Sequence, residues 1–193
     1  MNEIAKLSLA KLTAETADPR AGAAMDGVRK SLGFVPNMYA NMANSPSLLE
    51  TYLSGYQAFR AEGGFAPAEQ EVVFLTISRE NGCEYCMAAH SMVGEKMSGV
   101  SAPVLKALRA GEKLPDSKLE ALSEFTRIMV VNRGKPTSAE LRAFLEAGFN
   151  EQQALAVILA IAVKTLSNYA NHIFHTDVDP VFSGYRWDVP EAA

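Results

Sequence analysis

The stretch PAEQEVVFLTISRENGCEYCMAAH, residues 67–90, contains the features that decide the fold and the chemistry of this chain. It begins with a proline, which favours the first position of a helix, and continues with a mainly apolar segment towards Gly82. A second helical segment follows directly from Cys83. The stretch therefore predicts two consecutive helices that form an antiparallel hairpin around the turn Asn81-Gly82.

The rest of the chain has the same organisation, because proline or a small polar residue precedes most segments and glycine follows most of them. Strand-like alternation is absent, and the one β-prone run, residues 128–131, lies in a helical frame. We therefore predict an all-α fold and a single domain over residues 1–193, with a thiol-bearing core at about 67–112 and a helical second half at about 115–176. The expected helices cover residues 19–33, a short piece from 36, 46–63, 67–82, 83–99, 101–111, 115–134, 137–148 and 150–172, with a short turn after 177.

Composition excludes several classes of protein. The 193 residues include 18 basic and 22 acidic side chains, well mixed, so no Lys/Arg run is available to neutralise nucleic-acid phosphates. The N-terminal residues MNEIAK do not form an export signal, and the longest apolar run, Ala154 to Val163, is too short to span a bilayer. We expect a cytoplasmic protein without a membrane or nucleic-acid partner. In that reducing compartment a cysteine pair is more often catalytic or metal-binding than structural.

Two similar punctuation motifs occur at residues 99–101 and 148–150, each a glycine, an apolar residue and an N-cap residue. Each joins one helix to another that is rich in alanine and leucine. A duplicated helical hairpin would produce this repeated motif, and ordinary helix–loop–helix connections would produce it equally well. Only the first copy contains cysteines, so only that half could perform thiol chemistry.

Cys83 and Cys86 are the only cysteines, and His90 follows four residues after the second. Thiol chemistry proceeds through the thiolate, which a helix N-terminus and a nearby imidazole favour. Cys86 and His90 lie one turn apart on the same helix face. Glu71, on the preceding helix, shares a stripe with Leu75 that leads towards the turn, so the hairpin is expected to bring its carboxylate beside the pair.

Several interpretations of these residues are open. Cys83, Cys86, His90 and Glu71 are a permitted set of zinc ligands, although small zinc sites usually include a second Cys/His pair. Two inert buried cysteines are a further alternative, against which the adjacent turn indicates partial exposure. A redox dithiol is the favoured interpretation. Tyr85, between the cysteines, is either a packing aromatic or a catalytic hydroxyl that hydrogen-bonds a thiolate or a peroxide oxygen.

Three further residues are candidates for a substrate pocket. Met87 flanks Cys86, and Asn168 with His172 lies at the polar end of the long apolar helix. The alternatives are a gap-filling methionine and a helix C-terminal cap that contacts another subunit. No glycine-rich phosphate loop and no flavin or nicotinamide signature is present, so no cofactor and no metal are expected.

The spacing Glu71-x11-Cys83-x2-Cys86-x3-His90 resembles the core signature of the alkyl hydroperoxidase D-like proteins of the carboxymuconolactone decarboxylase superfamily. The similarity is greatest to the peroxidase-related branch, whose members have about this length. It extends over most of the chain, through the segments 33–37, 67–110 and 168–172. One position differs, since the best-studied hydroperoxidases have a histidine where Tyr85 stands.

The resemblance implies an alkyl hydroperoxidase D-like helical bundle, a homo-oligomer (dimer, trimer or hexamer) and cofactor-free, thiol-dependent reduction of a peroxide. By position, Cys86 would attack the peroxide, Cys83 would form the disulfide with it, and Glu71 with His90 would relay protons. An external dithiol, from a thioredoxin-like or lipoyl protein, must then reduce the disulfide. The decarboxylases of the superfamily lack the cysteine pair, which argues against that activity. The alternatives are a zinc-binding or redox-sensing oligomer without turnover, and a non-redox lyase or isomerase of the same fold.

Overall fold

A computed structural model of the chain describes residues 4–190, so the first and last three residues of the predicted domain 1–193 lie outside the described part. Within residues 4–190 all regular elements are helical and no strand is present, which confirms the all-α prediction. The elements are α1 (Pro19–Leu32), α2 (Asn37–Met42), α3 (Pro46–Glu62), α4 (Pro67–Glu80), α5 (Glu84–Lys96), α6 (Ala102–Ala110), α7 (Ser117–Val131), α8 (Ser138–Glu146), α9 (Glu151–Phe174) and the 3₁₀ helix η1 (Pro180–Tyr185).

Side-chain caps determine several helix starts. The Thr137 hydroxyl and the Asn150 amide each accept a hydrogen bond from the backbone N–H three residues on, and the side chain of that residue bonds back to the cap N–H. Both helix starts agree with the predicted ranges, which begin at residues 137 and 150. The start of α7 was predicted at Pro115, but the helix begins at Ser117, because the Asp116 carboxylate caps the N–H of the third helical residue.

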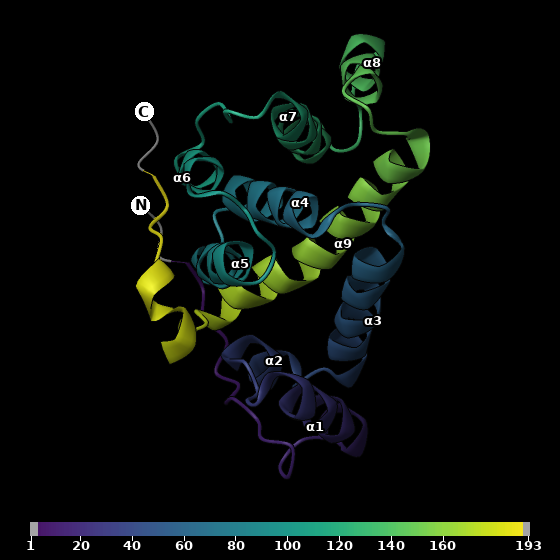
Figure 1. Cartoon of the computed structure of the whole chain (residues 1–193). Coiled ribbons are helices and arrows are strands. Elements are labelled where there is room, and N and C mark those ends of the chain that lie inside the picture. Colours follow the sequence, from purple (N-terminus) through teal and green to yellow (C-terminus); the bar gives the residue numbers. More distant parts are fainter. Residues whose placement is uncertain (1–3, 191–193) are drawn as a thin grey trace.

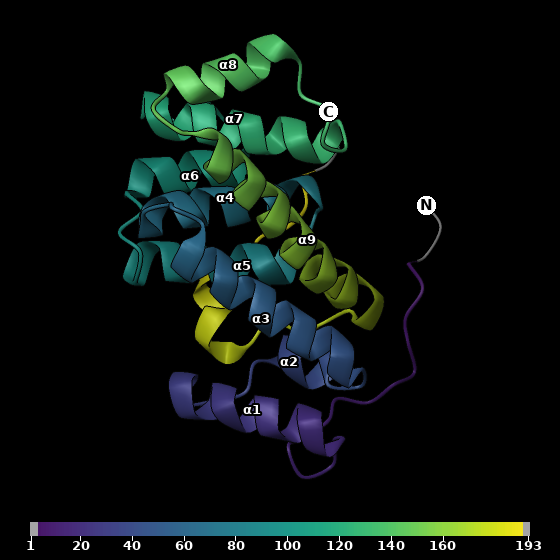
Figure 2. The same cartoon turned by 90° about the vertical axis from the view of Figure 1, so that its right-hand side faces the viewer.

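The predicted hairpin is formed by α4 and α5, which are joined by a short turn in which Gly82 adopts φ +65°. Helix α9 crosses the molecule diagonally and contacts α2, α3, α4, α5 and α7 (Figure 1). Helices α1 and α2 lie at one end of the molecule and α8 lies at the opposite end (Figure 2). The C-terminal η1 returns to pack against α5. Residues from both ends of the sequence therefore lie close to the thiol-bearing hairpin.

By length and composition alone, α9 would qualify as a membrane-crossing helix. The sequence analysis did not indicate this, because it considered only the apolar run that ends at Val163. The helix is longer than that run because it continues through Lys164 to Phe174. Its burial against five other helices is the environment of a core helix.

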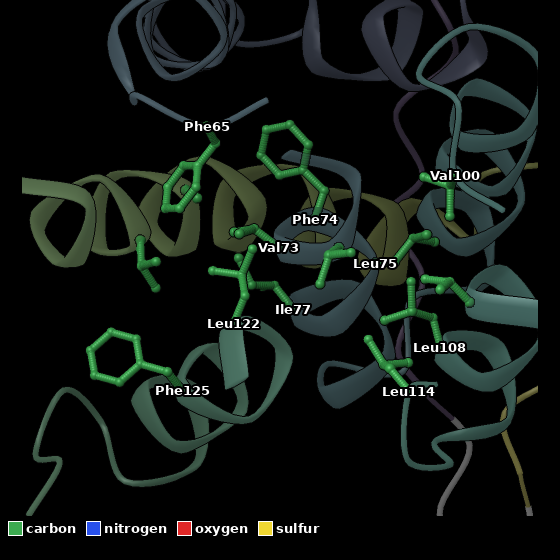
Figure 3. Packing of buried hydrophobic residues seen from close by; sticks show 14 of the residues in the cluster. Phe65, Val73, Phe74, Leu75, Ile77, Val100, Leu108, Leu114, Leu122 and Phe125 are labelled. Atoms are coloured by element: carbon green, nitrogen blue, oxygen red, sulfur yellow. The ribbon is translucent and has the colours of Figure 1, made fainter. Parts of the chain in front are cut away.

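One hydrophobic cluster surrounds α4 and fixes its position. Phe74, Leu75 and Ile77 of α4 are completely buried and pack with Leu122 and Phe125 of α7 (Figure 3). Complete burial of each such side chain contributes about 1.5–3 kcal/mol to stability. This packing holds α4 rigidly, and with it any functional side chain on the helix.

A second cluster encloses the cysteines. Cys83 and Cys86 pack with side chains from α1, α2, α3 and η1, among them Met25, Met42 and Phe182. Both sulfurs are therefore covered by the N-terminal helices on one side and by the C-terminal segment on another. The partial exposure expected for this pair is not found, since Cys83 is 0% and Cys86 is 2% exposed.

Candidate active site

The two cysteines occupy the first turn of α5. Cys83 is the N-cap residue, and its backbone N–H donates to the Ser78 carbonyl at 2.8 Å, which closes the turn after α4. Cys86 lies one turn further on. Both are free thiols, and they lie 3.5 Å apart. This is close enough for a disulfide to form with a small local adjustment.

Helix α9 supplies a polar contact to both sulfurs. Asn171 Nδ2 donates to Cys86 Sγ at 3.3 Å and to Cys83 Sγ at 3.7 Å. Ser167 Oγ lies 3.9 Å from Cys86 Sγ. The sequence analysis did not connect either residue with the cysteine pair. An amide N–H that points at a sulfur favours its thiolate form.

The phase argument placed the Glu71 carboxylate beside the cysteine pair, and the structure brings this carboxylate to His90, one turn after Cys86 on α5. Glu71 is completely buried on α4, and its Oε2 lies 2.8 Å from His90 Nδ1. The other carboxylate oxygen forms a salt bridge with Arg60 Nη2 and lies 3.5 Å from Ser98 Oγ. Arg60 also donates to the Tyr56 hydroxyl at 2.7 Å. Both carboxylate oxygens are thus paired, and one of them fixes the Nδ1 edge of the imidazole.

Lys164 of α9 contacts the other nitrogen of this imidazole. Its Nζ lies 2.9 Å from His90 Nε2, and the side chain is 0% exposed. An ammonium can only donate, so Nε2 is the acceptor and Nδ1 carries the proton that is donated to Glu71. The sequence analysis missed Lys164. Its signal was available, since residues 152–171 contain no other Asp, Glu, Lys or Arg and Lys164, Ser167 and Asn171 share one helix face.

The pKa values of the two thiols are shifted in opposite directions. Burial raises the pKa of Cys83 well above its usual value, and the hydrogen bond and negative charge of Cys86 add to this effect. Burial also opposes ionisation of Cys86. There, however, the hydrogen bond from Cys83 and the positive charge of Lys164 outweigh burial and hold the pKa well below its usual value. Cys86 is consequently the more acidic thiol of the pair.

Burial also changes the acidity of the paired groups. It lowers the pKa of His90, and the positive charge of Lys164 lowers it further, while Glu71 opposes the change. For Glu71 burial favours protonation, but His90 and Arg60 outweigh it and lower the pKa. The imidazole is therefore neutral and the carboxylate is ionised at neutral pH.

The Tyr85 hydroxyl does not form the predicted hydrogen bond to a thiolate. It donates to Asp179 Oδ2 at 2.5 Å, and burial together with this carboxylate raises the pKa of the phenol. The Met87 side chain is buried in the cluster around α4, whereas the cysteines belong to the other cluster. The structure thus brings together Cys83, Cys86, Glu71 and His90, and directs Tyr85 and Met87 elsewhere.

Asn168 lies beside the turn between α4 and α5, and His172 follows one turn further along α9. Asn168 is completely buried, and its Oδ1 accepts a hydrogen bond from Asn81 Nδ2 at 2.9 Å. In the described part of the chain, Asn168 Nδ2, Asn171 Oδ1 and His172 Nε2 are buried without a hydrogen-bond partner. An unpaired buried polar atom costs about 1–3 kcal/mol, so this end of α9 has unused hydrogen-bonding capacity next to the sulfurs.

Within residues 4–190 no group of three or more His, Cys, Asp and Glu side chains is arranged to hold a metal ion. The zinc set considered above needs a free nitrogen on His90. Both ring nitrogens are engaged, one by Glu71 and the other by Lys164. His90 therefore offers no free nitrogen for coordination of a metal ion.

Residues 46–117 match the model of the carboxymuconolactone decarboxylase family, which confirms the predicted family resemblance. No curated protein matches the sequence. An uncharacterized peroxidase-related protein from Ralstonia eutropha JMP134, described as an alkylhydroperoxidase AhpD core, has a similar structure (TM-score 0.78, 19% identity, 94% of this chain and 96% of that chain covered). A peroxidase-related protein from Silicibacter sp. TM1040 is also similar (TM-score 0.77, 18% identity, 95% and 96% covered).

A third solved structure is that of a cysteine-to-alanine variant of the debrominase Bmp8 in complex with 2,3,4-tribromopyrrole (TM-score 0.75, 14% identity, 95% of this chain and 97% of that chain covered). At these identities the three structures establish a common fold. Proteins of this fold therefore include both peroxidase-related proteins and a debrominase.

Proposed function

We propose that this chain, whose residues 46–117 match the model of the carboxymuconolactone decarboxylase family, is a thiol-dependent peroxide reductase that uses a Cys83/Cys86 dithiol–disulfide cycle. One observation carries the proposal. A buried Cys86 sulfur, in surroundings that favour its thiolate, lies 3.5 Å from a second free thiol. A nucleophilic thiolate with a protonated neighbouring thiol is the pair that peroxide reduction requires.

The reaction begins with attack of the Cys86 thiolate on the outer oxygen of the peroxide. A sulfur–oxygen bond forms, the oxygen–oxygen bond breaks, and the departing oxygen leaves as an alcohol or water after it accepts a proton. Cys86 becomes a sulfenic acid. The Cys83 thiol then displaces water from this sulfur to form the disulfide. Glu71 and His90, the predicted relay, support removal of the Cys86 proton and its return to the departing oxygen.

Completion of the cycle needs a partner. Cys83 and Cys86 are the only thiols in the sequence, so the two electrons that reduce their disulfide must come from an external dithiol. A thioredoxin-like or lipoyl protein has the required chemistry, and no bound cofactor takes part. Such a partner belongs to a reducing compartment, which is consistent with a cytoplasmic location.

We assign Asn168 and His172 to the surroundings of the substrate, and Met87 to the packing around α4. The unpaired buried atoms Asn168 Nδ2 and His172 Nε2 support the first part of this assignment, because a peroxide oxygen would satisfy them. Tyr85 contributes by anchoring the first turn of α5 to the C-terminal segment through Asp179.

We also propose a homo-oligomer that forms through α9. Its outer face exposes an apolar stripe made of Leu155 (66% exposed), Ile158 (50%), Tyr169 (60%) and Ile173 (41%). Contiguous apolar surface of this kind usually marks an interface. A second copy of the same stripe would bury it symmetrically.

The proposal is tested by following consumption of hydrogen peroxide and of an alkyl hydroperoxide with dihydrolipoamide as reductant. Cys86→Ser should abolish turnover. Cys83→Ser should react once and leave a sulfenic acid that dimedone traps, whereas the oxidised wild-type protein should lose two hydrogens by mass spectrometry. Unchanged turnover in Cys86→Ser would refute the mechanism. A brominated pyrrole tested in parallel would reveal a debrominase activity of the same thiols.

The remaining alternatives give different results in the same experiments. Stoichiometric zinc in the freshly purified protein, with thiols that do not react with peroxide, would support a metal-binding oligomer. Reversible oxidation without turnover would support a sensor. An activity that survives replacement of both cysteines would support a lyase or isomerase.

A further inference from the structure

Lys164 lies at the centre of the buried polar network without a carboxylate partner of its own. Its Nζ contacts His90 Nε2 at 2.9 Å, and its ammonium also lies over the Phe74 ring, 5.5 Å from the centroid. The Glu71 carboxylate is already paired with the Arg60 guanidinium. A buried ammonium that faces only a neutral imidazole would cost several kcal/mol, so a nearby anion must compensate for it.

Of the ionisable groups that the structure describes around Lys164, only one can supply that anion. The phenols are disfavoured, because burial raises their pKa values. Cys83 is held in its protonated form by burial and by Cys86. The Cys86 sulfur remains. Cys86 lies one turn before His90 on α5, which Lys164 contacts, and Ser167, on the same face of α9 as Lys164, lies 3.9 Å from the Cys86 sulfur. In this position the positive charge of Lys164 also helps to lower the pKa of Cys86. The ionisable groups that surround Lys164 and the sulfurs are Cys83, Cys86 and His90 of α5, Glu71 of α4, Tyr52, Tyr56 and Arg60 of α3, and Tyr39 of α2.

We propose that Lys164 forms an ion pair with the Cys86 thiolate in the reduced protein and is the acid that protonates the oxygen leaving the peroxide. This proposal rests on the proposed peroxide reduction and identifies the group that links its relay to the sulfur. His90 Nε2 is blocked by Lys164 and cannot accept the Cys86 proton directly. His90 and Glu71 therefore act as positioning residues, which hold the Lys164 nitrogen beside the thiolate.

Charge and protons balance through the cycle. The reduced site contains one thiolate and one ammonium. When Cys86 takes the outer oxygen, the electron pair of the broken oxygen–oxygen bond goes to the departing oxygen, which takes a proton from Lys164 and leaves as alcohol. The site now holds a sulfenic acid and a neutral amine. Cys83 expels water to give the disulfide, again without a buried net charge. Reduction by an external dithiol gives two thiols, and the Cys86 proton returns to Lys164.

The ion pair can be tested without peroxide. In a Cys83→Ser protein Cys86 is the only thiol, and the ionisation of that thiol is followed by ultraviolet absorbance against pH. Lys164→Met keeps the side-chain volume and removes the charge, and it should raise the titration midpoint by at least about one pH unit. Lys106→Met, at an exposed position on α6, is the matched control and should leave the midpoint unchanged. An unchanged midpoint in a folded Lys164→Met protein would overturn the ion pair.

The proton-transfer step is tested with Lys164→Arg, which keeps the positive charge but does not release a proton at neutral pH. Its thiolate titration should resemble that of the parent protein. Its rate with tert-butyl hydroperoxide, whose leaving alkoxide is strongly basic, should fall about 10²- to 10⁴-fold. The rate with peroxyacetic acid should fall far less, because acetate leaves without a proton.

The outcomes separate the two proposals. An equal loss of rate with both peroxides would overturn the role of Lys164 as the acid, while peroxide reduction itself would stand. A parent protein that shows the Lys164-dependent thiolate and reduces neither peroxide would overturn the proposed function and the protonation step together. Circular dichroism and urea unfolding of each variant confirm that the measured changes come from folded protein.

Discussion

The Tyr85 hydroxyl donates to Asp179 Oδ2 at 2.5 Å, and the same carboxylate accepts hydrogen bonds from the Asn37 backbone N–H at 3.2 Å. One buried carboxylate thus joins the thiol helix to α2 and to the C-terminal segment. We expect Tyr85→Phe to lower the free energy of unfolding by about 1–3 kcal/mol, because Asp179 loses a charge-assisted hydrogen bond. Peroxide turnover should remain close to that of the wild type. Urea unfolding and initial rates provide the two measurements.

Tyr185→Phe is the matched control for this prediction. The Tyr185 hydroxyl also bonds a carboxylate, that of Glu95, but the pair lies at the surface. Its removal should have a smaller effect on stability. If Tyr85→Phe instead lost most of its activity at unchanged stability, the hydroxyl would be catalytic, as the sequence analysis allowed.

Glu71 should make the stability of the protein sensitive to acid. Its pKa is lower in the folded state than in the unfolded chain, so its contribution is present above the unfolded value, near 4.5, and is lost as pH falls through the folded value. The pKa of His90 is also lowered by folding. Its contribution begins to fall below about 6.5, where the unfolded chain takes up a proton first. Urea midpoints measured across this pH range should decline in two stages.

Glu71→Gln should remove the lower stage and should lower stability at neutral pH by up to about 3 kcal/mol, because Arg60 loses its buried counter-ion but keeps some contact with water. Glu124→Gln, which removes one partner of a surface ion pair with Arg127, is the matched control. It should leave the lower stage of the decline in the urea midpoint in place. A lower stage of this decline that is identical in wild type and Glu71→Gln would contradict its assignment to Glu71.

The apolar stripe on α9 leads to a prediction about assembly. Placing two carboxylates on it, in Leu155→Glu combined with Ile158→Glu, should weaken self-association at least about a hundredfold, since each buried charge costs more than the 1.4 kcal/mol that corresponds to a factor of ten. Sedimentation velocity across a range of concentrations measures the effect. Leu32→Glu, at a half-exposed position on α1, controls for the added charge. A wild-type chain that is monomeric at every concentration would contradict the interface.

Most of the local structure could be predicted from the sequence, because the relevant signals are local. Proline, capping residues and glycines lie within one turn of the boundaries that they determine, which is why nearly all of the helices were located. The Glu71–His90 contact was also predictable, since both residues belong to one helical hairpin with a short turn. The phase of α4 was sufficient to select Glu71 from its acidic neighbours.

The contacts that were missed come from distant parts of the chain. From α9, Lys164 reaches His90 and Asn171 reaches the sulfurs, and Asp179 reaches Tyr85 across 94 positions of sequence. Periodicity shows which residues share a helix face, but it does not show which other helix that face meets. The solitary lysine in an apolar helix was the one available indication, because a buried charge requires a partner.

The close crossing of α3 and α9 provides the last prediction. A Cβ atom added at Gly55 would lie 2.7 Å from Val163 Cγ2, next to Lys164 in the sequence. Val163 is buried and branched at Cβ, so it cannot easily move aside. Gly55→Ala should therefore lower the free energy of unfolding by about 1–3 kcal/mol, despite the better helix propensity of alanine.

Gly27 gives the matched control, because it lies on the exposed face of α1 and a Cβ there meets nothing within 4 Å. Gly27→Ala should raise stability by about 0.5–1 kcal/mol through helix propensity alone. Opposite signs for the two substitutions in urea unfolding would establish that α3 and α9 meet at Gly55. Because α9 carries Lys164 and Asn171, Gly55→Ala should also reduce peroxide turnover. A Gly55→Ala protein as stable as Gly27→Ala would mean that the two helices are further apart than described.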